Sequence, residues 1–158
     1  MRSLPCSFAA ALLAPFAVAQ CPFHTVTAQS YGQGCNPVFA GQIPTVAIAL
    51  DATACSLDAA VGAFGGCCNT YLVGHLLVLG PQQVAVPLPG FGVGCTLLAD
   101  PAIVLFAPAM VGGTFTLPLP TVALPPLTFF VQGAAFYFTT IGFDYDFALS
   151  AGGQVDVS

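Results

Sequence analysis

The sequence predicts an all-β protein, a two-sheet antiparallel β-sandwich of Greek-key or jelly-roll type that is stapled by disulfides. Apolar runs of five to nine residues alternate with Gly and Pro, which is the spacing of short strands and turns. β-Branched and aromatic residues fill these runs, whereas apolar positions at helical spacing are scarce. An even number of cysteines, six, follows residue 19, as in the disulfide frameworks of exported proteins.

The punctuation divides the chain into short candidate strands. We expect strands over residues 45–51, 71–79, 83–88, 95–99, 102–107, 114–117, 127–132, 135–141, 143–149 and 154–157. Residues 58–64 (DAAVGAF) form the one plausible helical turn, which Gly62 weakens.

Alternation along a strand predicts which faces are buried. In residues 142–147 the aromatic side chains of Phe143, Tyr145 and Phe147 point to one face, and those of Asp144 and Asp146 point to the other. We therefore expect a strand that packs its aromatic residues inward and turns its aspartates to water.

Two runs and one proline-rich stretch do not alternate. Residues 76–79 (LLVL) and 103–106 (IVLF) are apolar throughout, which predicts strands covered on both faces. Proline cannot donate a hydrogen bond in a central ladder, so the stretch around Pro118, Pro120, Pro125 and Pro126 is expected to be a loop or a frayed edge.

The N-terminal residues have the features of a secretory signal peptide over residues 1–19. Arg2 provides the positive charge, residues 4–16 provide a short apolar stretch, and residues 17–19 (AVA) form a cleavage site. We expect residues 20–158 to form a single β-sandwich domain that is secreted and lies outside the cell or at its surface.

The cysteines predict three disulfides, for which six cysteines allow fifteen pairings. The candidates are Cys21, Cys35, Cys55, Cys67, Cys68 and Cys95. An aromatic-Gly-x-Gly-Cys pentapeptide occurs twice, at residues 31–35 (YGQGC) and 91–95 (FGVGC), and its glycines allow close backbone approach. We expect Cys35 to pair with Cys95, Cys55 with Cys67 or Cys68, and the remaining cysteine of that pair with Cys21.

The charge distribution excludes several classes of function. Arg2 is the only basic residue, the chain has no glutamate, and its six acidic residues are all aspartates. Nucleic acid, phosphate and anionic lipid are normally bound by cationic side chains, so we expect no nucleic-acid partner. No segment after residue 19 has 18 uninterrupted apolar residues, so we expect no membrane span. A weakly charged, partly apolar exterior favours self-association or a cell-surface or matrix partner.

The YGQGC segment, residues 94–98 (GCTLL), the proline-rich stretch and the closing residues 154–157 (QVDV) carry a resemblance. They resemble small exported β-rich domains that planctomycete-type bacteria encode in many copies, alone or at the end of larger exported proteins. The resemblance implies an extracellular domain without established catalytic residues. The segment at residues 66–69 (GCCN) departs from the pattern of these domains.

The strongest candidate for a metal site is Asp144-x-Asp146. Two carboxylates on one strand face lie roughly 6.5–7 Å apart, and no Lys or Arg is available to balance them. Calcium takes six to eight oxygen ligands, so Asp51 or Asp100 and loop carbonyls would have to complete its shell. A solvated strand face and the paired carboxylates of a glycosidase are the alternative interpretations.

The remaining polar residues indicate no catalytic machinery. His75 lies in an apolar strand, which favours a neutral, hydrogen-bonded core histidine, and His24 is near the expected N-terminus. Ser30, Ser56 and Ser150 lie in no nucleophile motif. We expect no enzymatic activity and no cofactor, calcium being the one possible exception.

A cluster of aromatic residues lies between residues 129 and 138. Phe136 and Phe138 share a strand face that Tyr137 opposes, so part of the cluster faces outward. The cluster is either core packing or an exposed apolar ledge. We expect an exported, non-enzymatic structural or adhesive module of the cell surface or extracellular matrix. The alternative is a carbohydrate- or small-ligand-binding module that uses calcium at Asp144 and Asp146.

Overall fold

A computed structural model describes residues 21, 24–91 and 94–158. The expected signal peptide, residues 1–19, lies outside the described residues. The elements are β1 (Val26–Tyr31), β2 (Thr45–Asp51), β3 (Ser56–Gly62), β4 (Gly66–Cys67), β5 (Thr70–Gly80), β6 (Gln83–Pro87), η1 (Pro89–Phe91), β7 (Thr96–Ala99), β8 (Ile103–Pro108), η2 (Ala109–Val111), β9 (Thr114–Pro118), β10 (Leu127–Thr139) and β11 (Asp144–Val157). The helical elements of the described chain are thus the two short 3₁₀ turns η1 and η2.

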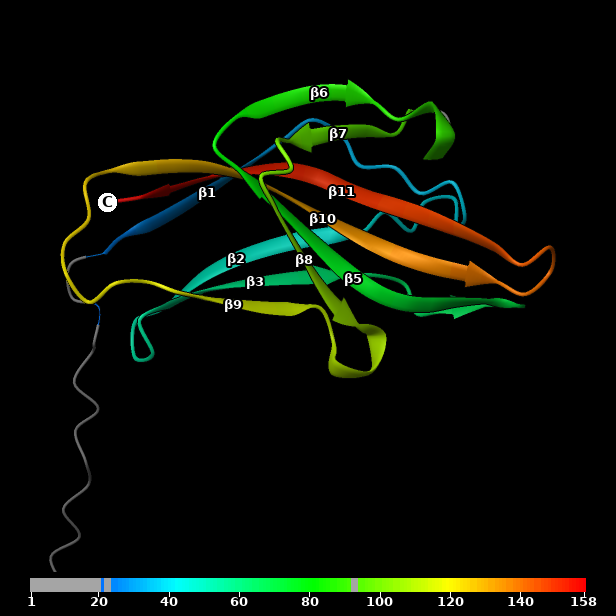
Figure 1. The fold of residues 1–158 in the computed structure, drawn as a ribbon, viewed down its shortest axis with the longest axis horizontal. Coiled ribbons are helices and arrows are strands. Elements are labelled where there is room, and N and C mark those ends of the chain that lie inside the picture. The colour runs from blue at the N-terminus through cyan, green and yellow to red at the C-terminus, as the bar shows by residue number, and fades with distance from the viewer. Residues whose placement is uncertain (1–20, 22–23, 92–93) are drawn as a thin grey trace, which may run out of the picture.

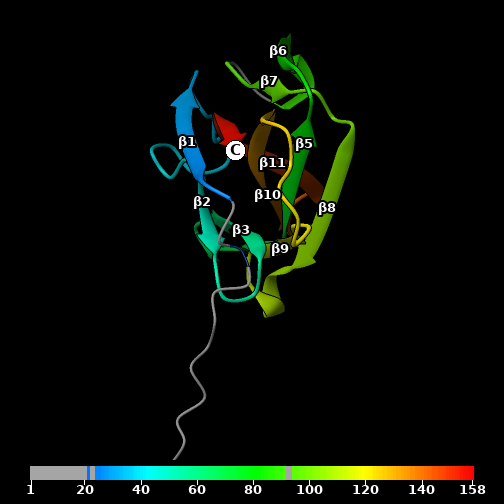
Figure 2. The same cartoon turned by 90° about the vertical axis from the view of Figure 1, so that its left-hand side faces the viewer.

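Two antiparallel sheets pack face to face, as the sequence predicts. The large sheet has the order β1-β11-β10-β5, and both β8 and β4 pair with the far side of β5; the small sheet has the order β2-β3-β9. A separate ribbon of β6 and β7 lies on the outer face of the large sheet. The end-on view shows the small sheet, the large sheet and the β6–β7 ribbon as successive layers (Figures 1 and 2).

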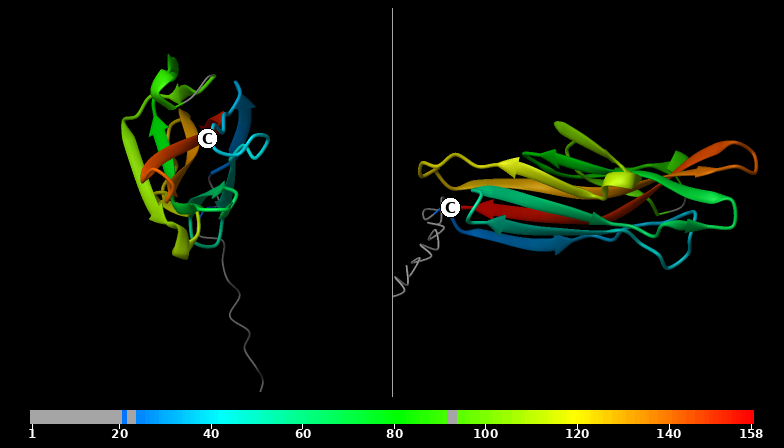
Figure 3. Two further views of the ribbon diagram at one scale, coloured as in Figure 1. Left: turned by 90° about the vertical axis from the view of Figure 1, so that its right-hand side faces the viewer. Right: turned by 90° about the horizontal axis from the view of Figure 1, so that it is seen from below.

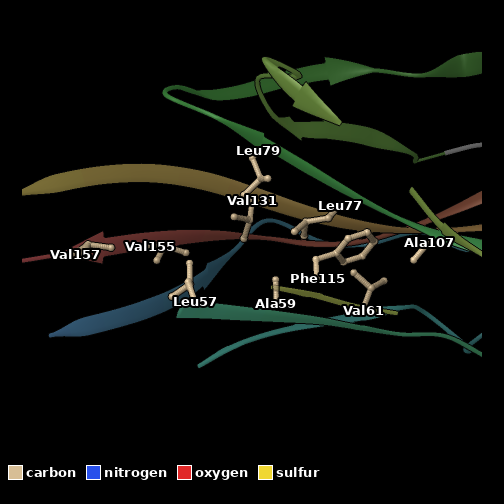
Figure 4. Packing of buried hydrophobic residues seen from close by; sticks show 10 residues of the cluster. All are labelled: Leu57, Ala59, Val61, Leu77, Leu79, Ala107, Phe115, Val131, Val155 and Val157. Carbon is tan, nitrogen blue, oxygen red and sulfur yellow. The ribbon is translucent and has the colours of Figure 1, made fainter. Parts of the chain in front are cut away.

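The main core fills the space between the two sheets (Figure 4). β3 contributes alternate residues, Leu57, Ala59 and Val61, which are 0 to 3 % exposed, and β5 contributes Leu77 from the opposite sheet. Burying a leucine side chain contributes roughly 1.5–3 kcal/mol, so this layer carries much of the stability. Phe115 of β9 completes the packing from the small sheet.

A buried side chain of the large sheet bonds to the β6–β7 ribbon. Gln132 of β10 is 0 % exposed. Its side-chain oxygen accepts from Leu98 N, and its amide donates to the carbonyls of Thr96 in β7 and Ser150 in β11. Tyr31 adds a bond from its hydroxyl to the Leu98 carbonyl oxygen (2.6 Å). The ribbon therefore covers one part of the outer face, and the β10–β11 hairpin extends beyond it (Figure 1).

Most of the expected strands are confirmed, and two pairs of them are continuous. The expected strands 127–132 and 135–141 merge into one strand, β10, which ends at Thr139; the expected strands 143–149 and 154–157 merge into β11, which begins at Asp144. A bulge between Gln132 and Ala134 keeps β10 and β11 paired across the glycine that separates the two expected strands. The proline-rich stretch follows β9 as a loop, as expected.

Two expectations about strands are wrong, and two observed strands were not expected. Residues 58–64 are not a helical turn, because residues 56–62 form β3, which pairs with both β2 and β9. Residues 103–106 are not covered on both faces, because β8 is an edge strand that pairs only with β5; Ile103, Val104 and Phe106 are 53 to 55 % exposed. The short strands β1 and β4 have no counterpart among the expected strands.

The structure contains two disulfides among the described cysteines. Cys35 pairs with Cys95, as expected. The expected partners of Cys55 are wrong, because Cys55 pairs with Cys21, and Cys67 and Cys68 are free and exposed. Backbone pairing explains this outcome: Cys21 N donates to Ala52 O in the β2–β3 turn, which places Cys21 next to Cys55.

Candidate functional site

An aromatic surface covers the part of the large sheet that the β6–β7 ribbon leaves open. Residues that are directly opposite on neighbouring strands point to the same face, and Tyr71, Phe138 and Tyr145 form one such row across β5, β10 and β11. Phe136 and Phe147 form the next row. The aromatic surface consists of Tyr71, Phe91, Phe106, Phe136, Phe138, Phe143, Tyr145 and Phe147.

The rings of the aromatic surface stack on one another. Phe136 lies between Tyr145 (centroids 5.1 Å apart, planes at 17°) and Phe147 (4.6 Å, 21°). Phe138 packs against Tyr145 with centroids 5.0 Å apart. Ring faces that stack on each other are not available to a ligand, so the stack of Phe136, Tyr145 and Phe147 presents its ring edges to the solvent.

The outermost rings of this surface are largely open to solvent. Phe143 is 80 % exposed, and Tyr145, Tyr71 and Phe106 are between 53 and 57 % exposed. A glycine makes room for one of them, because a Cβ at Gly74 would lie 2.5 Å from the Phe106 ring. Large contiguous apolar patches are rare on monomeric proteins and commonly mark interaction sites.

The β6–β7 ribbon forms one border of the surface. Phe91 of η1 packs edge-on against Phe147, with centroids 5.2 Å apart. The contact shields Phe147, which is half-buried, while the rings farther from the ribbon stay open.

The expected inward packing of Phe143, Tyr145 and Phe147 is wrong. Alternation does separate the aromatic from the acidic side chains, but the aromatic face is the outer one. The inner position is taken by Tyr137, which is 0 % exposed and donates from its hydroxyl to Phe64 O (2.9 Å). The ring of Phe39 covers Tyr137 from a distant loop, at a centroid distance of 5.4 Å.

The expectation that Phe136 and Phe138 oppose Tyr137 is confirmed. The remaining members of the surface were not identified as a site from the sequence. The sequence does contain a pattern that indicates Tyr145 and Phe147. Both strands of a hairpin carry aromatic residues at every second position, so these residues must meet across the strands.

Asp144 and Asp146 lie at the start of β11. Asp144 is exposed, and its Oδ1 accepts from the Tyr145 backbone N (2.8 Å). Asp146 is half-buried, and it lies on the same face as Tyr137, with which it is paired. No three His, Cys, Asp or Glu side chains gather into a possible metal site within the described part of the chain.

The other two aspartates that were considered for calcium are elsewhere. Asp51 Oδ1 accepts from Thr53 N and Ala54 N in the β2–β3 turn. Asp100 contacts Gly80 of β5. Gly80 and Gln154 of β11 pair with the same residue of β10, so Asp100 lies near Gln154. Gln154 is ten residues along β11 from Asp144, which is about 33 Å by strand rise. A calcium ion at Asp144 and Asp146 would take its other ligands from backbone oxygens and water.

The two histidines are both buried. His24 donates from Nε2 to the Pro120 carbonyl oxygen (3.0 Å), beside the Cys21–Cys55 disulfide. His75 faces the core on β5, and burial lowers its pKa, so it is a neutral core histidine. Its Nδ1 has no hydrogen-bond partner, in contrast to the bonded histidine expected.

The hydroxyls of Ser56 and Ser150 are buried in the fold, and neither bonds to a histidine. Ser150 Oγ accepts from Gly133 N and donates to Ala151 O. The Oγ of Ser56 is buried without a partner, and so is Nδ1 of His24, so these two atoms do not bond to each other.

A cleft opens between the sheets at the β8–β9 side. It has a volume of about 520 Å³ and is lined by Leu79, Gly80, Pro81, Ala102, Ile103, Leu105, Leu117, Leu127, Thr128 and Phe129. The lining carries no charged side chain, so the cleft has the size and character of a site for a small apolar molecule.

Within the described residues, no helix is both long and apolar enough to cross a membrane. In comparisons with protein families, curated proteins and solved structures, none matches this chain.

Proposed function

We propose that this protein is an exported, non-enzymatic structural and adhesive module that associates with further copies of itself through the aromatic surface. The observation that carries the proposal is the exposure of Phe143, Tyr145, Tyr71 and Phe106 on one face of the large sheet. Export is supported by the signal-like sequence of residues 1–19 and by two disulfides, which persist in oxidising compartments. The resemblance to exported β-rich domains of planctomycete-type bacteria supports the same placement.

The area of the surface is a large part of what a stable contact needs. An aromatic side chain has roughly 150–250 Å² to bury, so the exposed fractions of the four most open rings leave on the order of 400–600 Å². Val104, which is 53 % exposed and lies two residues before Phe106 on β8, extends the patch. A standard interface uses about 800 Å² on each partner, so this patch provides most of one.

The stacking in the middle of the aromatic surface favours another protein surface over a carbohydrate. A sugar ring stacks on an open aromatic face, whereas Phe136, Tyr145 and Phe147 occupy one another's faces. Protruding ring edges can instead interdigitate with the edges of a second copy, in the edge-to-face geometry that aromatic pairs prefer.

Charge also shapes the association. The chain has six aspartates and one basic residue, so two copies repel each other electrostatically. Added salt screens this repulsion and leaves the apolar contact intact. Association should therefore become stronger as the salt concentration rises, the opposite of a contact held by ion pairs.

Size-exclusion chromatography with light scattering tests the proposal under reducing conditions. The double variant Phe143→Ser/Tyr145→Ser should elute as a monomer at concentrations where the unmodified protein associates. The matched control is Met110→Ser/Val122→Ser, which also removes two exposed apolar side chains, 98 and 64 % exposed, outside the aromatic surface. Equal association of all three proteins would reject the proposal.

A second candidate function is binding of a small apolar molecule in the cleft between β8 and β9. The apolar lining and the volume of about 520 Å³ favour it. Fluorescence of N-phenylnaphthylamine should rise on binding and fall when dodecanol competes. Ala102→Trp would fill the cleft and abolish the signal, whereas Ala52→Trp, at an exposed turn, should not change it. Equal signals from both variants would exclude the cleft.

Calcium at Asp144 and Asp146 stays a prediction. If an ion binds there, millimolar calcium should raise the melting temperature, and Asp146→Asn should remove the increase. Identical melting curves with calcium and with a chelator would exclude this site.

A further inference from the structure

The two free cysteines form the tip of a tight hairpin. Gly66 pairs with Tyr71 and Cys67 with Thr70, so Cys68 and Asn69 are the two central residues of a two-residue turn. Both have positive φ, 62° and 118°, as the two central residues of a type I′ hairpin turn require. Cys67 and Cys68 are exposed, whereas the other cysteines of the described chain are buried and paired.

The hairpin tip adjoins the aromatic surface. Thr140 N donates to Asn69 O (2.8 Å), and the hydroxyls of Thr70 and Thr139 lie 3.0 Å apart, so the tip is fastened to the end of β10. Tyr71 of the aromatic surface follows the tip directly on β5. Figure 3 shows that the β10–β11 turn and the connection between β3 and β5 project at the same end of the molecule, away from the C-terminus.

A bond between the two thiols themselves is disfavoured. Consecutive Cα atoms are about 3.8 Å apart across a trans peptide, whereas disulfides span about 4.4–6.8 Å between Cα atoms. The neighbouring Cys68 thiol, through hydrogen bonding and its charge, raises the pKa of Cys67. Exchange with an external disulfide starts from a thiolate, so its rate should increase as the pH rises.

We propose that Cys67 and Cys68 are a covalent cross-linking site that joins two copies of this chain by disulfides. The inference rests on the proposed function, because the aromatic surface would bring two copies together at this end. A two-fold contact places the same patch of both copies face to face, and the two hairpin tips meet when the symmetry axis passes near this end of the patch.

The reaction needs an oxidant, and a low-molecular-weight disulfide supplies it. A thiolate of one copy attacks the small disulfide and forms a mixed disulfide, and one small thiolate leaves. A thiolate of the second copy then attacks the protein sulfur of the mixed disulfide and displaces the second small thiolate. Each bridge oxidises two protein thiols, which lose two hydrogens, and reduces one small disulfide to two thiols.

The experiment incubates the purified full chain with oxidised glutathione and uses non-reducing gels, intact mass and chymotryptic mapping. The expected product is a dimer whose mass is lower than twice the monomer mass by two hydrogens for each bridge, with the cross-link at residues 67–68. Cys67→Ser/Cys68→Ser should remain monomeric on the gel. Its melting temperature should match that of the unmodified protein, because both side chains are exposed.

Three outcomes would overturn the inference: a monomer with a bond between Cys67 and Cys68, a monomer that keeps free or glutathionylated thiols, or a covalent dimer that persists in the double variant. Phe143→Ser/Tyr145→Ser separates this inference from the proposed function. If that variant and the unmodified protein are both monomeric under reducing conditions but cross-link equally when oxidised, the proposed function fails and the cross-linking site stands.

Discussion

Gln132 gives the sharpest test of how the β6–β7 ribbon is held. Gln132→Leu keeps the side-chain volume and removes bonds to Leu98 N (2.9 Å), Ser150 O (2.9 Å) and Thr96 O (3.1 Å). The first two bonds are buried, and each backbone group left without a partner costs about 1–3 kcal/mol. The Thr96 bond is partly buried, so water can replace it in part. The expected loss is about 2–6 kcal/mol in the free energy of unfolding.

Urea unfolding at equilibrium measures this loss. The matched control is Gln154→Leu, since Gln154 is half-buried and its side chain bonds only to the Asp156 carboxylate. This control should change the free energy of unfolding by less than about 1 kcal/mol. In Gln132→Leu the Leu98 amide should also exchange its hydrogen faster, because it is left without an acceptor. Equal stability of the two variants would show that Gln132 does not fasten the ribbon.

Three further predictions concern the core and the backbone. Burial lowers the pKa of His75 below 6.5, so the unfolded chain takes up a proton at a higher pH than the folded protein does. The free energy of unfolding should therefore be highest above about pH 6.5 and decrease as the pH falls below that value. Urea titrations at several pH values should show a weaker dependence for His75→Gln. The Cys35–Cys95 disulfide joins residues 60 positions apart and so restricts the unfolded chain. Replacing both cysteines with alanine should lower the free energy of unfolding by about 4 kcal/mol. A decrease under about 1 kcal/mol would contradict this entropic contribution. Gly34→Ala should lower the melting temperature strongly, because the added Cβ would overlap the Leu149 carbonyl oxygen. Gly90→Ala, where a Cβ would meet nothing within 4 Å, should keep the melting temperature of the unmodified protein. Equal melting temperatures of the two variants would contradict this packing.

Strand positions could be predicted from local pattern, because a strand between Gly or Pro residues needs only its own residues to be recognised. The residues of β3 predict a helical turn because alanine favours helices over strands. The burial of β3 depends on pairing with both β2 and β9, which no local pattern encodes. The same limit applies to β8, whose apolar sequence does not reveal that it lies at an edge.

The aromatic surface could be predicted only in part. Alternation gives the shared face of Phe136 and Phe138, but aromatic residues occupy both faces of β10, so composition does not identify the inner one. The loop residue Phe39, almost a hundred positions away in the sequence, covers Tyr137 and thereby makes the Tyr137 face of β10 the inner one. Tyr71 joins the surface because β5 lies beside β10, which is a property of strand order.

Sedimentation velocity of the unmodified protein, with reductant present and at increasing salt, tests the central claim most directly. If the exposed rings of β10 and β11 hold copies together, the sedimentation coefficient should rise with protein concentration and rise further with salt. A concentration-independent monomer at every salt concentration would contradict the claim, and so would association that weakens as salt is added.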